Sequence, residues 1–254
     1  MKNFSKILFL TVMVLGWATN SSAIGLEVAA GGWAQNLDGE LSYKSALVDD
    51  SIDFDRDGGY GDEDRFFGRL NIDLPILPNV YFMGTQMEFE GDGTKSAPFS
   101  FGGTTFSETF YSKAKFDHYD LALYYGVPLT GVASLGTIGI DIGINVRQLK
   151  VDMVVRDKTL PTLTKSVDET LYIPMGFLAV QFKPTDKLSL EGELRGIAYS
   201  ENHYYDLIAR LKYRFAGPAF GAVGWRYEEL AIDEKDIIAN INVSGPFVEA
   251  GLQF

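Results

Sequence analysis

Apolar and polar residues alternate along much of the chain, in segments of about ten residues, the length of a tilted strand that crosses a membrane. The clearest segment places branched aliphatic residues against small or polar ones: Ile138, Ile140, Ile142, Ile144 and Val146 against Gly139, Asp141, Gly143, Asn145 and Arg147. Successive side chains of a β-strand point to opposite faces. The pattern therefore predicts a strand with one apolar face and one polar face.

Ten such segments are expected, near residues 26–35, 66–74, 81–90, 119–127, 138–147, 170–182, 188–198, 205–215, 223–228 and 237–254. Four connections are short, near residues 75–79, 128–133, 183–186 and 216–218, and two are long, near 36–64 and 91–110. Short turns at one end and long loops at the other are typical of bacterial membrane barrels. The pattern predicts an all-β fold, a transmembrane antiparallel up-and-down β-barrel of ten strands, with eight or twelve strands as alternatives.

The inferred outer face has the composition that a bilayer requires. A sheet survives in hydrocarbon only when it is closed, because each unpaired backbone amide costs several kcal/mol there. Aliphatic residues fill the middle of this face, and aromatic residues are expected at its two rims: Tyr81, Tyr125, Phe215 and Phe254 at one, and Phe66, Phe89, Tyr119, Tyr205 and Tyr227 at the other. The alternative is a secreted soluble β-barrel or sandwich, which would bury its aliphatic face.

One segment departs from the two-faced pattern. Residues 170–182 are apolar on both faces, so the register of this strand is ambiguous. The segment also contains Pro174, which cannot donate a hydrogen bond to a β-ladder. The proline therefore predicts either a bulge or a lateral gap in the barrel wall.

The two ends of the chain indicate export to the outer membrane. Lys2 and Lys6 precede an apolar run and the small residues Ser21-Ser22-Ala23, so residues 1–23 are interpreted as a cleaved secretory peptide and 24–254 as one barrel domain. An uncleaved anchor is the alternative, but its apolar core is shorter than the ~20 residues of a spanning helix. The final strand places Val248, Ala250, Leu252 and Phe254 on one face, a pattern similar to the signal that the barrel-assembly machinery reads.

Charge and cysteine content exclude several functions. After residue 23, 20 basic and 34 acidic residues give a formal net charge of −14, which disfavours binding of nucleic acid because its phosphates would be repelled. The chain has no cysteine, which excludes a lipid-anchored thiol, a disulfide and thiolate chemistry.

The polar faces of the strands carry charges of both signs, which are expected to form a charge network in the lumen: Glu27, Arg69, Glu88, Asp141, Arg147, Glu191, Glu193, Arg195, Arg210, Arg214, Arg226 and Glu228. Asp73, Asp120, Asp206 and Glu249 share these faces. Unpaired charges in a narrow lumen would be costly, whereas pairs across strands would fill it. A salt-bridged interior is therefore favoured over a water-filled path, which the net negative charge would make cation-preferring.

The first long loop contains a calcium-loop spacing. Asp53, Asp55, Asp57 and Asp64 occupy positions 1, 3, 5 and 12 of the template, with Gly58 at position 6. Two features depart from the template, because position 12 is Asp rather than Glu and no helices flank the loop. The alternative is an acidic surface loop that sits among divalent ions bridging lipopolysaccharide. No other cofactor is expected.

Candidate catalytic residues are few. His118 and Asp120 share a strand face and form the one candidate dyad of an omptin-like protease at the outer rim. The order His-x-Asp differs from that of omptins, and no facing Asp pair can be placed. The sequence therefore predicts no enzymatic activity.

Several short motifs resemble a family of Gram-negative outer-membrane barrels named for a Gly-Gly motif. They are Gly31-Gly32-Trp33, Leu77-Pro78-Asn79, Tyr124-Tyr125, Gly224-Trp225-Arg226-Tyr227 and Ser244-Gly245-Pro246-Phe247. The resemblance implies a barrel in the cell outer membrane, in contact with lipid and lipopolysaccharide, and implies no catalytic residues. Three functions stay open: a structural or interaction barrel with a filled lumen, a small porin-like channel for cations or apolar solutes, and a rim hydrolase.

Overall fold

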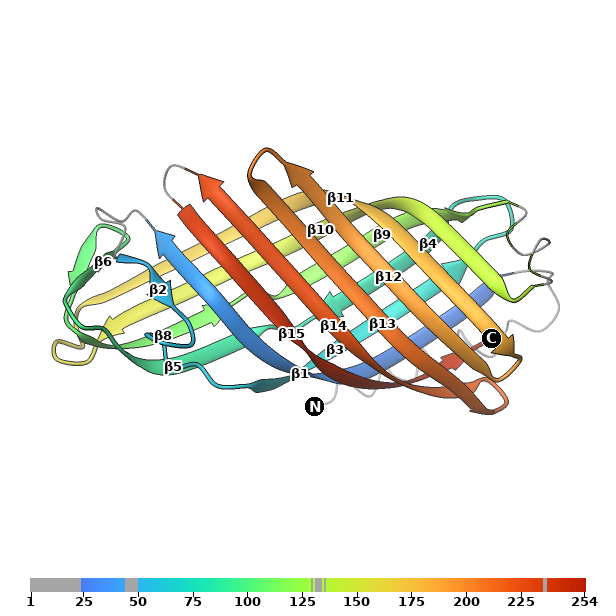
Figure 1. Ribbon diagram of the computed structural model, residues 1–254, viewed down its shortest axis with the longest axis horizontal. Helices are drawn as coiled ribbons and strands as arrows, with labels where there is room; N and C mark the ends of the chain where they lie inside the picture. The colour runs from blue at the N-terminus through green and yellow to red at the C-terminus, as the bar shows by residue number, and fades with distance from the viewer. Residues whose placement is uncertain (1–23, 44–49, 129, 131–133, 135, 235–236) are drawn as a thin grey trace, which may run out of the picture.

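The strands form a closed antiparallel barrel (Figure 1). Its wall has ten positions around the circumference, here called staves, each formed by one strand or by two consecutive strands. The computed structural model describes residues 24–43, 50–128, 130, 134, 136–234 and 237–254. The expected secretory peptide, residues 1–23, lies outside the described residues. No helix of the described residues is long and apolar enough to cross a membrane.

Six staves are single strands that are neighbours in the wall in the order of the chain: β10 (Ile138–Asp157), β11 (Thr164–Thr185), β12 (Leu188–Tyr199), β13 (Asn202–Ala216), β14 (Ala219–Glu234) and β15 (Ile237–Gln253). β1 (Gly25–Tyr43) and β3 (Glu63–Asp73) complete the single staves. The other two staves are each built from two strands, β4 (Asn79–Thr85) with β5 (Glu88–Thr94), and β8 (Thr109–Lys115) with β9 (His118–Gly126). β4 pairs with β9, and β5 pairs with β8.

The barrel closes between its first and last strands, as predicted. β1 pairs with β15 from Glu27–Gln253 to Tyr43–Ile237. The Phe254 amide donates to the Leu26 carbonyl at 2.8 Å, which extends the ladder by one residue. All ten expected strands are present, although most are longer than expected toward the long-loop end of the barrel. The short-turn end holds the connections at 74–78, 186–187 and 217–218.

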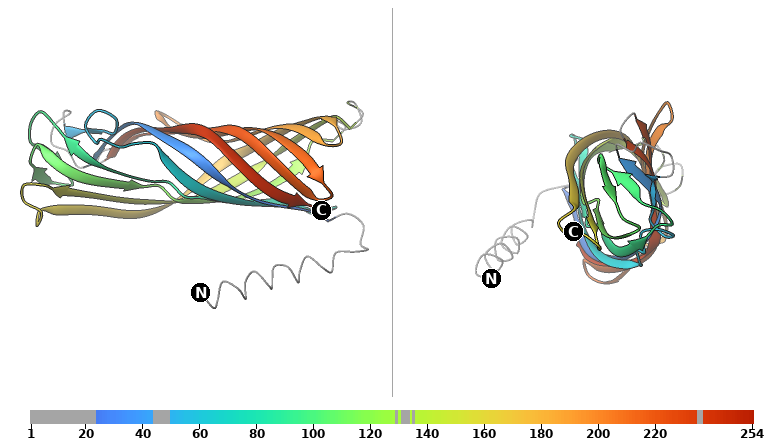
Figure 2. Two further views of the ribbon diagram at one scale, coloured as in Figure 1. Left: turned by 90° about the horizontal axis from the view of Figure 1, so that it is seen from below. Right: turned by 90° about the vertical axis from the view of Figure 1, so that its left-hand side faces the viewer.

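The long-loop end carries two small elements that lie within the barrel outline (Figure 2, right). β2 (Ile52–Asp53) pairs with β1, and β6 (Phe99–Phe101) pairs with β7 (Thr104–Phe106) as a separate hairpin. Phe99, Phe101 and Phe106 of this hairpin are buried. The mouth at this end is therefore filled by aromatic side chains.

The outer and inner faces reverse their polarity along the barrel. Over the short-turn half, the outer face is apolar, with Ile142 and Ile144 exposed on β10, while the inner face holds buried charges such as Arg147. Over the long-loop half, the inner face is apolar and the outer face is polar: Phe89 is buried between the outward-facing Glu88 and Glu90. The first half therefore has the surface of a membrane protein, and the second half has that of a water-soluble one.

This reversal corrects one expectation of the sequence. Tyr81 and Phe89 were expected on the outer rims, but they are 3% and 0% exposed and point inward, while Phe82 lies on the outer face. Residues 79–85 carry apolar side chains on both faces, so this segment alone does not indicate which face points inward. The expected orientation therefore depended on the charged residues that follow. Those residues, Glu88 and Glu90, belong to the half in which charge faces outward.

The ladder between β11 and β12 stops short of the long-loop end. β11 pairs with β10 over most of its length, from Phe182–Ile138 to Thr164–Arg156, but with β12 only as far as Gly176–Gly196. Extending this register would place Ile173 opposite Tyr199, the last residue of β12, so Thr164–Tyr172 has no residue of β12 to face. The unpaired edge begins beside Pro174. The register with β10 runs through Pro174 without a shift, so the proline marks the end of the ladder with β12 and not a bulge.

Candidate functional site

The inner face of the short-turn half holds a connected set of ion pairs, here called the lumen network. It contains six basic and seven acidic side chains: Arg69, Arg147, Arg195, Arg210, Lys212 and Arg226 with Glu27, Asp120, Glu191, Glu193, Asp206, Glu228 and Glu249. Every one of these cations contacts at least two carboxylates. The charges of the network nearly cancel, as a low-dielectric interior requires.

The tier nearer the short turns joins the first and last strands to the opposite wall. Arg69 donates to Glu249 through Nε at 3.1 Å and Nη2 at 2.8 Å, and its Nη1 lies 2.6 Å from Glu27. Lys212 bridges Glu27 at 3.0 Å and Glu191 at 2.6 Å. Planar guanidinium groups suit this two-pronged contact with carboxylates.

The tier nearer the long loops centres on Arg147. Its Nε and Nη2 each lie 2.9 Å from an oxygen of Asp120, and its Nη1 lies 2.8 Å from Glu228. Nη2 also contacts Asp206. Arg147 therefore neutralises carboxylates from three staves, and its side chain is fully buried. Asn145 supports the arrangement by donating to Asp120 at 2.7 Å.

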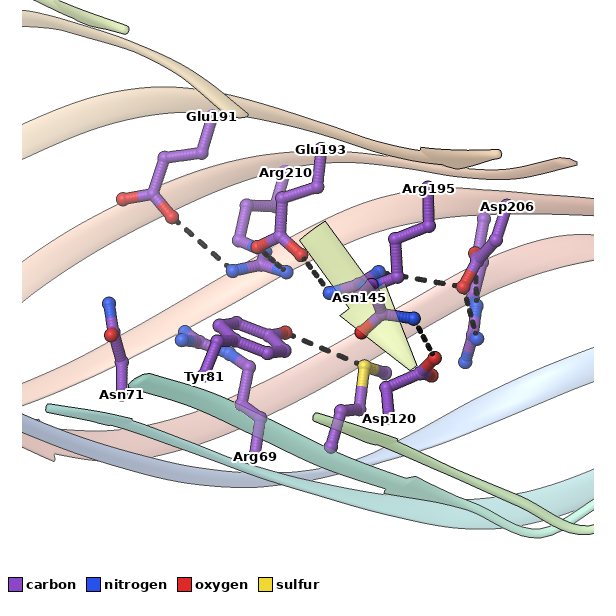
Figure 3. Close-up of polar contacts among 12 residues, drawn as sticks. Arg69, Asn71, Tyr81, Asp120, Asn145, Glu191, Glu193, Arg195, Asp206 and Arg210 are labelled. Atoms are coloured by element: carbon purple, nitrogen blue, oxygen red, sulfur yellow. Dashed lines mark hydrogen bonds and ion pairs between the residues drawn. The ribbon is translucent and has the colours of Figure 1, made fainter. Parts of the chain in front are cut away.

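Arg195 and Arg210 connect the two tiers across the lumen (Figure 3). Glu193 lies 2.8 Å from Arg195 through one oxygen and 2.7 Å from Arg210 through the other. Arg195 reaches Asp206 at 3.5 Å on its other side. The network thus has no break between the two tiers.

Aromatic rings cover the faces of most of these cations. Arg226 lies over Trp33, Arg147 over Tyr204 and Arg195 over Tyr81, with 4.7–4.8 Å between guanidinium carbon and ring centroid. Such stacking contributes about 0.5–2 kcal/mol each, with the larger values for desolvated pairs. The inward orientation of Tyr81, unexpected from the sequence, serves this purpose.

His118 is part of this packing and not of an exposed cleft. Its Nδ1 lies 3.1 Å from the Phe116 carbonyl and its Nε2 lies 3.0 Å from Arg226 Nη2. Because both of those contacts are best met by an Nδ1–H donor and an Nε2 acceptor, the ring is neutral. His118 is fully buried, and its Nε2 lies 3.9 Å from Asp120, beyond hydrogen-bond distance. The exposed dyad that an omptin-like hydrolase would need is therefore not formed.

Nine of the twelve residues predicted for the lumen lie in the network, and three do not. Glu88 lies on the outer wall, where it pairs with Lys113 and Lys115 at 2.9 and 3.3 Å, because it belongs to the long-loop half. Arg214 is exposed at the short-turn mouth and donates to Gln253 at 2.7 Å. Asp141 lies in the short-turn half and has no ion pair among the described residues.

The lumen residues predicted from the sequence did not include Lys212, although this residue shares the inward face of its strand with Arg210. They also did not include Tyr204, whose hydroxyl donates to Glu228. Tyr204 alternates with Tyr205, so only the register of the strand separates the inward tyrosine from the outward one.

The four carboxylates of the calcium template do not gather into one site. Asp57 accepts from Lys95 at 3.0 Å and from Arg56 at 3.0 Å. Burial raises the pKa of Asp57, but the hydrogen bonds from Arg56 and Lys95 outweigh it, so its pKa lies below the ordinary value. Asp55 is exposed, and Asp64 is exposed on the even-numbered, outward face of β3.

One other group of metal-ligand types exists among the described residues. Ligand atoms of His118, Asp206 and Glu228 lie within 4.8 Å of one another. Arg226 contacts all three, at 3.0, 2.8 and 3.1 Å. A guanidinium group thus already supplies the positive charge that a metal would bring.

Comparison with known proteins gives similarity of fold alone. No protein-family description matches the chain, and no curated protein matches it. Among solved structures it is similar to the translocator domain of the autotransporter NalP from Neisseria meningitidis, with 11% identity, a TM-score of 0.45, and 100% of this chain and 96% of that chain covered. For the transport unit of the autotransporter AIDA-I from Escherichia coli the values are 10%, 0.40, 96% and 96%. For Ail, the attachment invasion locus protein of Yersinia pestis, they are 8%, 0.37, 91% and 99%.

Proposed function

We propose that the chain is an integral protein of the bacterial outer membrane, with a structural or interaction role and a lumen closed to ions. The lumen network carries this proposal. Six cations and seven carboxylates pair across the barrel at 2.5–3.8 Å. In a water-filled pore, by contrast, such charged side chains line an open path. Above the network, the buried aromatic residues of the long-loop end form a second, apolar layer.

Membrane insertion rests on the outer face of the short-turn half. The exposed residues Leu121, Leu123, Ile142, Ile144 and Val223 would be costly in water and are favourable in hydrocarbon. Outer-membrane lipid and lipopolysaccharide are the expected contacts of this face, and the barrel-assembly machinery is the expected partner during insertion. No catalytic residue is assigned.

Electrical recording tests the proposal. The purified protein, refolded and inserted into a planar lipid bilayer, is expected to give no steady current above that of the lipid alone. An open porin inserted by the same procedure serves as the positive control. Steady single-channel steps from the wild-type protein would overturn the closed lumen.

A second function, passage of apolar solutes through the wall, is favoured by one observation. The unpaired edge of β11 opens beside the inward-facing Ile173 and Ile197, which pack against the apolar layer. Cells that carry the protein would then take up an apolar fluorescent dye faster than cells without it. Equal uptake rates would exclude this route for that dye.

A further inference from the structure

The lumen opens at the short-turn end into a pocket of about 290 Å³, here called the basic vestibule. Four of its lining residues are basic: Lys183 on β11, Lys187 in the turn to β12, and Lys212 and Arg214 on β13. The buried ring of Phe220 forms part of its wall. All four cations come from neighbouring staves, so their charges add at one place in a chain that is strongly acidic.

The cations of the vestibule differ from those deeper in the barrel. Lys212 is held by Glu27 and Glu191 and so belongs to the lumen network. Lys183, Lys187 and Arg214 are exposed and make no ion pair within the part of the chain that the structure describes. Asp186 is the single carboxylate among the lining residues, all of which are described.

The unbalanced charge of the vestibule defines its ligand. Three unpaired cations and one carboxylate leave a charge of +2, whereas the lumen network deeper in the barrel is nearly neutral. A phosphate group carries about −1.5 to −2 charges at neutral pH and three oxygens that accept strong hydrogen bonds. Arginine and lysine together are the usual donors to such a group, the first through its fork and the second as a point charge.

We propose that the basic vestibule is a binding site for a phosphate-bearing anion at the short-turn mouth of the barrel. The anion replaces the missing carboxylate partners of Lys183, Lys187 and Arg214. Its source is either a soluble phosphate compound or the headgroup of an anionic phospholipid at the rim. The three cations that would bind the anion lie outside the lumen network, so the proposal does not depend on whether the lumen conducts ions.

Two triple variants with the same change in net charge test the site. The first is Lys183→Gln, Lys187→Gln and Arg214→Gln. The control is Lys150→Gln, Arg156→Gln and Lys165→Gln, which removes three cations nearer the long-loop end of the barrel. None of these three cations has an ion pair among the described residues. Circular dichroism of both variants in detergent, compared with wild type, checks that the barrel is retained.

Binding is measured with inorganic phosphate by titration calorimetry, and with phosphatidylglycerol against phosphatidylcholine by native mass spectrometry. Wild type is expected to bind one of the two phosphate probes saturably. The first triple variant should weaken that binding at least about tenfold, because it removes three charged hydrogen-bond donors. The control should change it less than about twofold.

The two arms identify the source of the phosphate. Binding of inorganic phosphate that only the first variant loses assigns a soluble ligand, and selective retention of phosphatidylglycerol that only this variant loses assigns a lipid. Absence of saturable binding to both probes, or equal weakening by the two variants, overturns the proposal.

Discussion

At the scale of single residues, neighbouring glycines of the Gly-Gly motif have different roles. A β-carbon on Gly31 would lie 2.3 Å from the Val248 carbonyl oxygen and 2.6 Å from the Phe67 ring, whereas one on Gly32 would meet nothing within 4 Å. Phe67 is the register partner of Gly31, so its ring lies over the space that the glycine leaves. The same arrangement joins Phe247 to Gly224.

Gly31→Ala is therefore expected to destabilise the barrel by about 1–3 kcal/mol, the usual cost of overpacking, and Gly32→Ala by much less. The midpoint of urea unfolding in lipid vesicles measures both. Equal midpoints for the two variants would contradict the distinction between the inward and outward glycine.

A second prediction concerns Arg147. Arg147→Gln leaves Asp120, Asp206 and Glu228 without the guanidinium that joins them, and removal of one partner from a buried ion pair costs about 3–5 kcal/mol. The unfolding midpoint should fall accordingly. Arg156→Gln is the matched control, because this exposed arginine has no carboxylate partner among the described residues and should shift stability by about 0.5 kcal/mol or less.

The residues of the network could be predicted from the sequence where alternation was unambiguous. Arg147 sits in a strand with one aliphatic face, and its inward position followed from that pattern alone. Glu88 was misplaced because alternation states which residues share a face, and not which face points inward. Pairing partners such as Arg69 with Glu249, 180 positions apart, depend on closure and register and could not be read from the sequence.

At the scale of elements, all ten strands and the closure of β1 on β15 were predictable, because period-two alternation and turn residues are local signals. The division of two staves into β4 with β5 and β8 with β9 was not. Both interruptions lie where the polarity of the wall reverses. Because the outer face changes from apolar to polar along these strands, no single pattern of alternation continues through the whole strand, and the prediction relied on such a pattern.

The unpaired edge of β11 gives a prediction for backbone exchange. In an antiparallel ladder, alternate residues direct their N–H groups to opposite neighbours. Between Thr164 and Ile173 the amides that face β10 should exchange slowly, and those on the free edge should exchange fast. From Phe177 to Phe182 both sets should be protected, as in β13, which has two partners. Residue-resolved hydrogen exchange by NMR measures this, and slow exchange of every amide from Thr164 to Ile173 would show that the edge is covered.

At the scale of the whole molecule, the proposed function implies that the lumen is closed by two different layers. Paired charges of the lumen network would close the short-turn half, and apolar packing of the aromatic residues would close the long-loop half. The β6–β7 hairpin supplies Phe99, Phe101 and Phe106 to the second layer. Its two flanks meet where the Lys95 amide donates to the Glu108 carbonyl at 2.8 Å, so a short glycine linker can replace residues 96–107.

Removal of one layer is therefore expected to leave the barrel silent in a planar bilayer. The hairpin deletion and the triple variant Arg147→Ser, Arg195→Ser, Arg210→Ser should each show no steady current, and the two combined should conduct. Seven carboxylates would then face the three cations that stay in the lumen, so the reversal potential in a salt gradient should indicate preference for cations. A steady current from the hairpin deletion alone would show that the ion pairs do not block the path. A silent combined variant that retains its β-sheet circular dichroism would show that these two layers are not what closes it.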